Sequence, residues 1–146
     1  MPIYTIGFTQ KPASRFFSLL RENRIEVLVD IRLHPEGQLA GFAKRADLPY
    51  FLTELTGSRY QHLDALAPTD EILKEYRANK NWDAYTVRFE ALLDERGVPD
   101  TLDRSLFAEN RCCLLCSEAT PERCHRRLVA ARLSAAWNLG PIVHLV

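Results

Sequence analysis

The sequence has no excess of charge of either sign. Nineteen Lys and Arg residues balance nineteen Asp and Glu residues, so the formal net charge at pH 7 is zero. A surface without overall charge has no long-range attraction for the nucleic-acid backbone or for acidic membranes. Recognition of an anion must therefore depend on a local group of cations. The charge balance neither favours nor excludes nucleic acid as a partner.

Long hydrophobic runs are also absent. Met1 leads directly into the short apolar run of residues 3–6 without a basic leader, and no segment is long enough to span a membrane. The four cysteines all lie between residues 112 and 124, whereas a disulfide framework spreads its cysteines along the chain. We therefore expect a cytoplasmic protein with reduced thiols and no membrane partner.

The length of 146 residues, with 47% hydrophobic residues, suits one domain with a core that needs no disulfides. Strand-like apolar runs occupy residues 3–8, 27–32, 60–63, 112–116 and 142–145. Helical patterns occupy residues 13–23, 47–56, 70–78, 82–95 and 120–138, and a loop of about fourteen residues, 33–46, interrupts the alternation. This order predicts an α/β fold: a single three-layer domain over residues 1–146, with a mostly parallel sheet flanked by helices.

Polar and reactive side chains gather where the predicted strands end. Ligands of an open parallel sheet bind beyond the carboxyl ends of its strands, so these side chains are expected to converge at one edge. The residues concerned are Gly7, Asp30, Arg32, His62, Cys116 and Glu118, together with Cys124, His125 and Arg126 at the start of the last helix.

The spacing Cys113-x-x-Cys116 raises the possibility of zinc, but strand geometry opposes it. Side chains three apart on a strand point to opposite faces and lie roughly 10 Å apart, too far for one ion. A site that uses only Cys116, Cys124 and His125 stays open as an alternative, although adjacent ligands at 124 and 125 diverge on a helix. We therefore expect neither a metal nor another cofactor.

A reactive thiol is the favoured interpretation. Cys124 lies near a helix N-terminus, where the helix dipole stabilises a thiolate, and Cys116 is its partner or a second nucleophile. Either thiol would act as nucleophile or thiol ligand, with His125 or His62 as the proton-transfer group. The alternative is that both thiols are small buried core residues.

Charged residues complete the expected pocket. Arg32 and Arg126 would hold a small anion, oriented by Asp30 and Glu118. Lys44 would reach the anion from the long loop, and Gly7 would line the pocket at the end of the first strand. The alternative is that Arg32 pairs with Asp30, and Arg126 with Glu118, in purely structural contacts, while Lys44 is simply solvated.

Three functions fit this pattern. The first is an enzyme-like pocket for an anionic ligand, such as a nucleotide or a nucleic-acid-derived molecule. The second is a non-catalytic module that binds a nucleotide or a partner through the same cations. The third is a metal or redox sensor.

Five motifs resemble the uncharacterised domain-of-unknown-function family 488, in order and over essentially the whole chain. They are Tyr4-Thr5-Ile6-Gly7, Val29-Asp30-Ile31-Arg32, Tyr60-x-His62-Leu63, Leu115-Cys116-Ser117-Glu118 and Cys124-His125-Arg126. The resemblance implies an α/β fold and a shared pocket, and no established activity. The chain has Gly37-Gln38 where the family pattern has Ser-Arg, and Ala67-Pro68 where it has Gly-Gly, so a phosphate contact from the loop arginine is in doubt.

Overall fold

The computed structural model describes residues 1–36 and 38–146, and the side chains of residues 38–40 are not described. Five strands form one sheet in the order β3-β2-β4-β1-β5, and every pairing is parallel. The strands are β1 (Ile3–Gly7), β2 (Val27–Asp30), β3 (Arg59–His62), β4 (Cys112–Cys116) and β5 (Ile142–Leu145). The predicted α/β fold with a mostly parallel sheet is confirmed.

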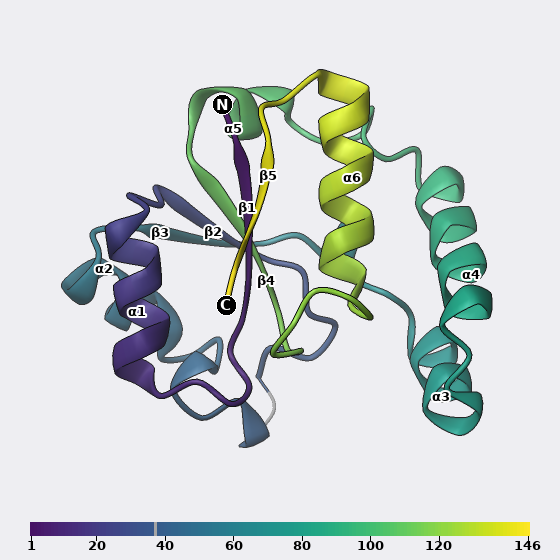
Figure 1. Ribbon diagram of the computed structural model, residues 1–146, viewed down its shortest axis with the longest axis horizontal. Helices are drawn as coiled ribbons and strands as arrows, with labels where there is room; N and C mark the ends of the chain where they lie inside the picture. Colours follow the sequence, from purple (N-terminus) through teal and green to yellow (C-terminus); the bar gives the residue numbers. More distant parts are fainter. Residues whose placement is uncertain (37) are drawn as a thin grey trace.

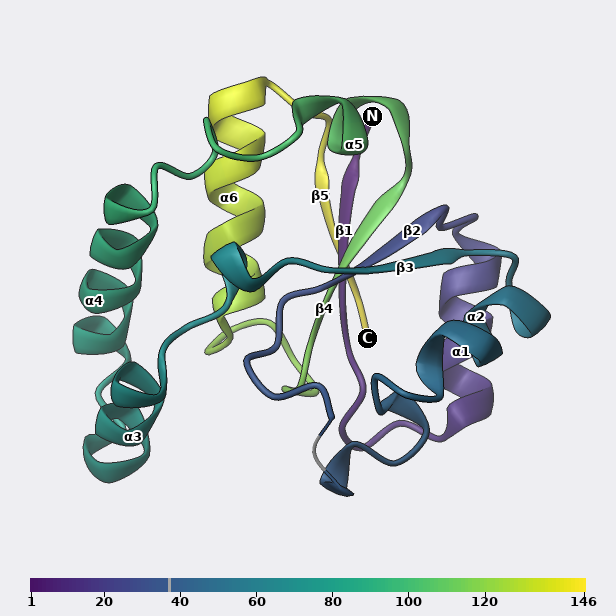
Figure 2. The ribbon, with the colours of Figure 1, turned by 180° about the vertical axis from the view of Figure 1, so that it is seen from behind.

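Helices cover both faces of this sheet (Figure 1). One face carries α1 (Ala13–Glu22) and α2 (Leu48–Leu55), and the other carries α3 (Asp70–Asn79), α4 (Trp82–Glu95), α5 (Arg104–Glu109) and α6 (His125–Trp137). Figure 2 shows the same two layers from behind. Within the described residues, no helix combines the length and the apolar character needed to cross a bilayer.

The central strands are buried along their whole length because helices pack on both of their faces. Successive side chains of a strand alternate between faces. Cys113 and Leu115 accordingly lie in the core beneath α1 and α2, whereas Cys112 and Leu114 lie in the core beneath α4 and α6. The same alternation places Cys116 on the α6 side, as expected from the sequence.

Three local features differ from the sequence expectations. The last helix begins at His125 and not near residue 120, because the chain from 117 to 124 forms bends and turns. The short helix α5 was not predicted, and the 33–46 loop contains a 3-10 segment, Gln38–Ala43. The Gly37-Gln38 pair departs from the family pattern. Gly37 and the side chain of Gln38 lie outside the part of the chain that the structure describes.

Candidate functional site

A cavity of about 340 Å³ opens at the carboxyl edge of the sheet, between the ends of β2 and β4, the α3–α4 pair and the start of α6. Three predicted site residues, Cys116, Cys124 and His125, line it next to one another. Arg32 and Glu118 line it as well. This cavity thus opens at the edge predicted from strand polarity.

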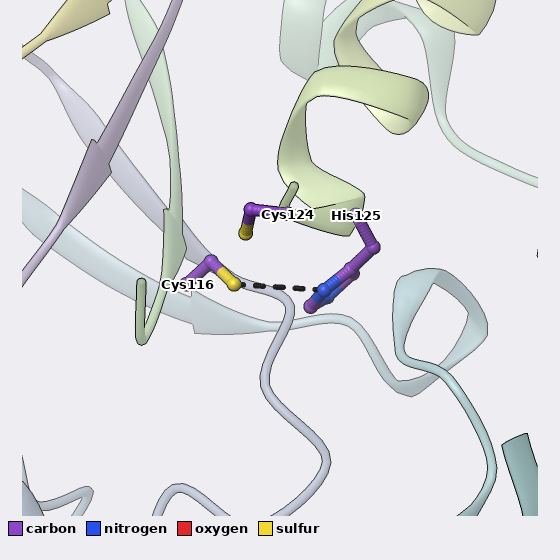
Figure 3. A group of neighbouring side chains, drawn as sticks. All are labelled: Cys116, Cys124 and His125. Atoms are coloured by element: carbon purple, nitrogen blue, oxygen red, sulfur yellow. Dashed lines mark hydrogen bonds between the residues drawn. The ribbon is translucent and has the colours of Figure 1, made fainter. Parts of the chain in front are cut away.

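Cys116 and His125 are hydrogen-bonded to each other in this cavity (Figure 3). Cys116 Sγ lies 3.5 Å from Nδ1 of His125, and Nε2 of His125 lies 2.8 Å from the carbonyl oxygen of Ile31. A carbonyl only accepts, so Nε2 carries the proton and the other ring nitrogen faces the sulfur. Phe89 packs edge-on against the imidazole, with 5.4 Å between ring centroids. The ring is therefore held in both position and tautomer.

Cys124 joins this pair because of how α6 begins. Cys124 is the N-cap and has an extended backbone, with φ −134° and ψ 140°, while His125 is the first helical residue. With this backbone, the side chains of Cys124 and His125 both lie on the side of Cys116 (Figure 3). The donor atoms of Cys116, Cys124 and His125 consequently lie within 4.8 Å of one another. The expectation that residues 124 and 125 diverge on a helix is wrong.

The environment favours a different protonation state for each of the two thiols. Burial raises the pKa of the Cys116 thiol, but a hydrogen bond from Cys124 and the charge of the His125 imidazolium outweigh it and hold that pKa well below its usual value. Burial and the neighbouring Cys116 raise the pKa of Cys124 well above its usual value. Burial lowers the pKa of His125, yet Cys116 reverses this effect and raises it. These opposite shifts make Cys116 the more acidic of the two thiols.

Arg126 lies beside Cys124 and is fully buried, and it is not among the described residues that line the cavity. Its guanidinium donates to the carbonyl oxygen of Glu118 at 2.5 Å and to Oγ1 of Thr5 at 3.3 Å, and its Nη1 lies 4.0 Å from Cys124 Sγ. Among the described residues, no carboxylate pairs with it, and its Nη2 has no hydrogen-bond partner. The backbone, and not the carboxylate, of Glu118 is thus its contact.

Arg32 differs, because it pairs with Asp30 through two hydrogen bonds of 2.9 and 2.7 Å. Tyr60 donates to the same carboxylate at 2.5 Å, and burial together with this bond raises the pKa of the Tyr60 phenol. Arg32 also donates to the Ala43 carbonyl at 2.7 Å. Asp30 and Arg32 therefore form the ion pair that the sequence analysis named as the alternative to a ligand role. Asp30 is not among the described residues that line the cavity.

Three further predicted residues lie away from the cavity. His62 contacts the Arg32 carbonyl and Asp64, at 2.8 and 3.0 Å. Gly7 lies beneath the Glu118 carbonyl, where a Cβ would come within 1.6 Å of the oxygen. His62, Gly7 and the half-buried Lys44 are not among the described residues that line the cavity. A ligand in this cavity would not touch them without movement.

Sequence reasoning missed the wall that α3 and α4 build opposite the thiols. It consists of Tyr76, Arg77, Lys80, Trp82 and Tyr85, and Arg123 adds a further cation from the turn before α6. Trp82 and Tyr85 stack, with ring centroids 4.9 Å apart. In the sequence these aromatics read as the apolar stripe of a helix. Only the position of the helix pair over the sheet edge makes them part of a site.

Comparison with known families supports the assignment made from the motifs. Residues 12–133 match the family described as Domain of unknown function DUF488. The chain belongs to the DUF488 family. The match includes all three residues of the thiol–imidazole cluster, while β1 and β5 lie outside it. Comparisons with curated proteins and with solved structures give no significant match.

Proposed function

We propose that this DUF488 protein binds a small phosphate-bearing ligand, of the size and chemistry of a nucleotide, and acts on it through the Cys116–His125 pair. The observation that carries the proposal is that the cavity wall has more basic than acidic side chains. Arg77, Lys80 and Arg123 lie on it, and in the described part of the chain none of them forms an ion pair. Glu118 is the one carboxylate in the described lining.

Two other basic side chains of the wall contribute less, since each already contacts a carboxylate. Arg32 pairs with Asp30, and His34 pairs with Asp70 at 3.0 Å. The aromatic rings suit the base of a nucleotide, because any of the bases can stack on an aromatic face. Tyr76 and Trp82 are only half-buried and present such faces beside the cations.

Within the site, Cys116 is the proposed nucleophile and His125 its proton-transfer partner, at the 3.5 Å separation that the geometry provides. Cys124 and Glu118 are the supporting groups nearest to them. The free state of all four cysteines supports a reducing compartment, so we place the protein in the cytoplasm.

The first experiment measures ligand binding. Adenosine monophosphate and inorganic phosphate are titrated by calorimetry and by tryptophan fluorescence. We expect the nucleotide to bind more tightly than phosphate, and Lys80→Gln and Arg123→Gln each to weaken it about tenfold, which corresponds to about 1.4 kcal/mol. Arg15→Gln is the matched control, because Arg15 lies on α1 and donates to the C-terminal Val146 carbonyl.

Two outcomes decide between the alternatives. Equal effects of Arg15→Gln and Arg123→Gln, or no binding at all, refute the cavity as an anion site. Binding that persists in Cys116→Ala and Cys124→Ala, with no turnover of the bound nucleotide in the native protein, leaves only a non-catalytic binding module.

A further inference from the structure

We propose that Cys116, Cys124 and His125 together bind one divalent metal ion of the zinc class, with the fourth coordination position open to the cavity. The sequence argued against this because residues 124 and 125 would diverge. The structure removes that objection, since the extended N-cap turns Cys124 toward His125 and toward the end of β4 (Figure 3).

The distances fit a tetrahedral ion. Zinc binds sulfur at about 2.3 Å and imidazole nitrogen at about 2.0–2.1 Å, so the sulfur–nitrogen edge of a tetrahedron is about 3.5–3.6 Å. The separation of Cys116 Sγ and His125 Nδ1 is 3.5 Å. All three donor atoms lie within 4.8 Å of one another, so small rotations of the side chains complete the set.

The surroundings have the features of a metal site. A ligating histidine usually donates its other N–H to a backbone carbonyl or a carboxylate, which fixes the ligating nitrogen. His125 donates from Nε2 to the Ile31 carbonyl at 2.8 Å and leaves Nδ1 for the ion. The guanidinium of Arg126, 4.0 Å from Cys124 Sγ, provides an N–H group and a positive charge beside a thiolate ligand.

The other two cysteines do not belong to this group of ligands. Cys113 lies in the core on the opposite face of the sheet, and the Cys112 thiol donates to the Leu106 carbonyl at 3.2 Å. Two sulfurs and one imidazole with a fourth position left free correspond to a reactive metal site, whereas structural sites use four protein ligands. The three ligands all line the cavity, so a small molecule in it can reach the ion.

Metal binding also explains why the cavity would prefer an anion. Two thiolates neutralise a divalent ion, and the buried Arg126 then leaves one positive charge uncompensated by any described carboxylate. This last step rests on the proposed function, in that the phosphate-bearing ligand would supply the balancing charge. With the ion bound, Cys116 and His125 are ligands and no longer nucleophile and proton-transfer partner, so the metal form keeps only the ligand-binding part of the proposed function.

The test uses the full chain, reduced, treated with a chelator and titrated with Co²⁺ and then Zn²⁺ in the absence of oxygen. We expect one Co²⁺ per chain, with thiolate-to-cobalt charge-transfer bands and the intense visible bands of a tetrahedral ion, which Zn²⁺ abolishes. Cys116→Ser and Cys124→Ser should lose these bands, and Cys113→Ser, a buried thiol of the same strand, should keep them. Absence of uptake by the native chain, or uptake by Cys116→Ser and Cys124→Ser equal to that of the native chain, overturns the proposal.

A second measurement needs no variant. Zn²⁺ should protect Cys116 and Cys124 from a neutral alkylating reagent, as located by peptide mass mapping, and should raise the unfolding temperature by binding the native state. Labelling of both residues at the same rate with and without Zn²⁺ contradicts the site. Uptake of Co²⁺ without nucleotide binding would leave the metal site standing and remove the proposed function. Nucleotide binding by protein that takes up no metal would do the reverse.

Discussion

Two arginines are buried at the carboxyl edge of the sheet, and their surroundings differ sharply. Arg32, at the end of β2, has a carboxylate partner in Asp30, and Tyr60 donates to the same carboxylate. Arg126, in the first turn of α6, has a backbone carbonyl, a hydroxyl and a thiol as its contacts. Both charges are removed from water, yet only the first has a fixed counterion.

The difference separates a cation with a fixed counterion from one that is free to attract an anion. A buried ion pair is neutral and fixes the local geometry, so Arg32 and Asp30 tie the end of β2 to the loop at Ala43. An unpaired buried cation raises the potential of its surroundings, and Arg126 does this beside Cys124. We therefore expect different losses of stability when each arginine is replaced by an apolar residue of similar size. The loss should be large at Arg32 and small at Arg126.

Arg32→Met should have the largest effect on stability. The substitution leaves the carboxylate of Asp30 buried without its partner, which costs about 3–5 kcal/mol of the free energy of unfolding. Urea unfolding measures this loss. The double variant Asp30→Asn with Arg32→Met removes both charges and should recover much of the stability, and a double variant as unstable as the single one would contradict the pairing.

Gly7→Ala should follow with a loss of about 3 kcal/mol, at the upper end for an overpacked site. A Cβ at this position would lie 1.6 Å from the Glu118 carbonyl oxygen and 2.7 Å from Nη1 of Arg126, so the turn after β4 must shift. We expect the variant also to bind Co²⁺ more weakly, because this turn precedes Cys124. A stability equal to that of the native chain would show that the turn moves freely.

Tyr60→Phe should cost about 1.5 kcal/mol, the usual size for a hydrogen bond to a charged group. The phenol donates to Asp30 at 2.5 Å, and its loss leaves that carboxylate with Arg32 alone. Tyr50→Phe is the control, since Tyr50 is 66% exposed and should change stability little. Equal losses in the two variants would argue against a role for Tyr60 in the pair.

Arg126→Met should have the smallest effect on stability, within about 1 kcal/mol, because it removes a buried charge that has no carboxylate to leave behind. Its effect on the site should be larger: nucleotide binding weakens in calorimetry although the unfolding transition is nearly unchanged. A loss as large as that of Arg32→Met would mean that Arg126 is as structural as Arg32.

The sequence predicts the sheet and the edge at which the candidate residues gather, because both depend on local patterns. The apolar run before Asp30 and the run of residues 112–116 read as buried strands, and polarity at strand ends marks the edge. Strand alternation separates Cys113 from Cys116, as found. These inferences need only the period of a strand and the parallel direction of the sheet.

The rest depends on contacts between segments far apart in the chain. Thr120-Pro121-Glu122 is a good local start for a helix, yet Cys124 is extended and next to Cys116, so α6 begins later. The cationic side chains of Arg77 and Lys80 look like ordinary solvated residues of α3 and its C-cap. Their place at the site follows from the docking of α3 and α4, which no local pattern predicts.

The strand order has a consequence for synthesis on the ribosome. β1 is made first, but its two neighbours in the sheet are β4 and β5, which begin at Cys112 and Ile142. The apolar strand β1 must therefore remain without its sheet partners until the residues of β4 and β5 have emerged. Long-range pairing of this kind slows folding and exposes the unpaired strand to other chains.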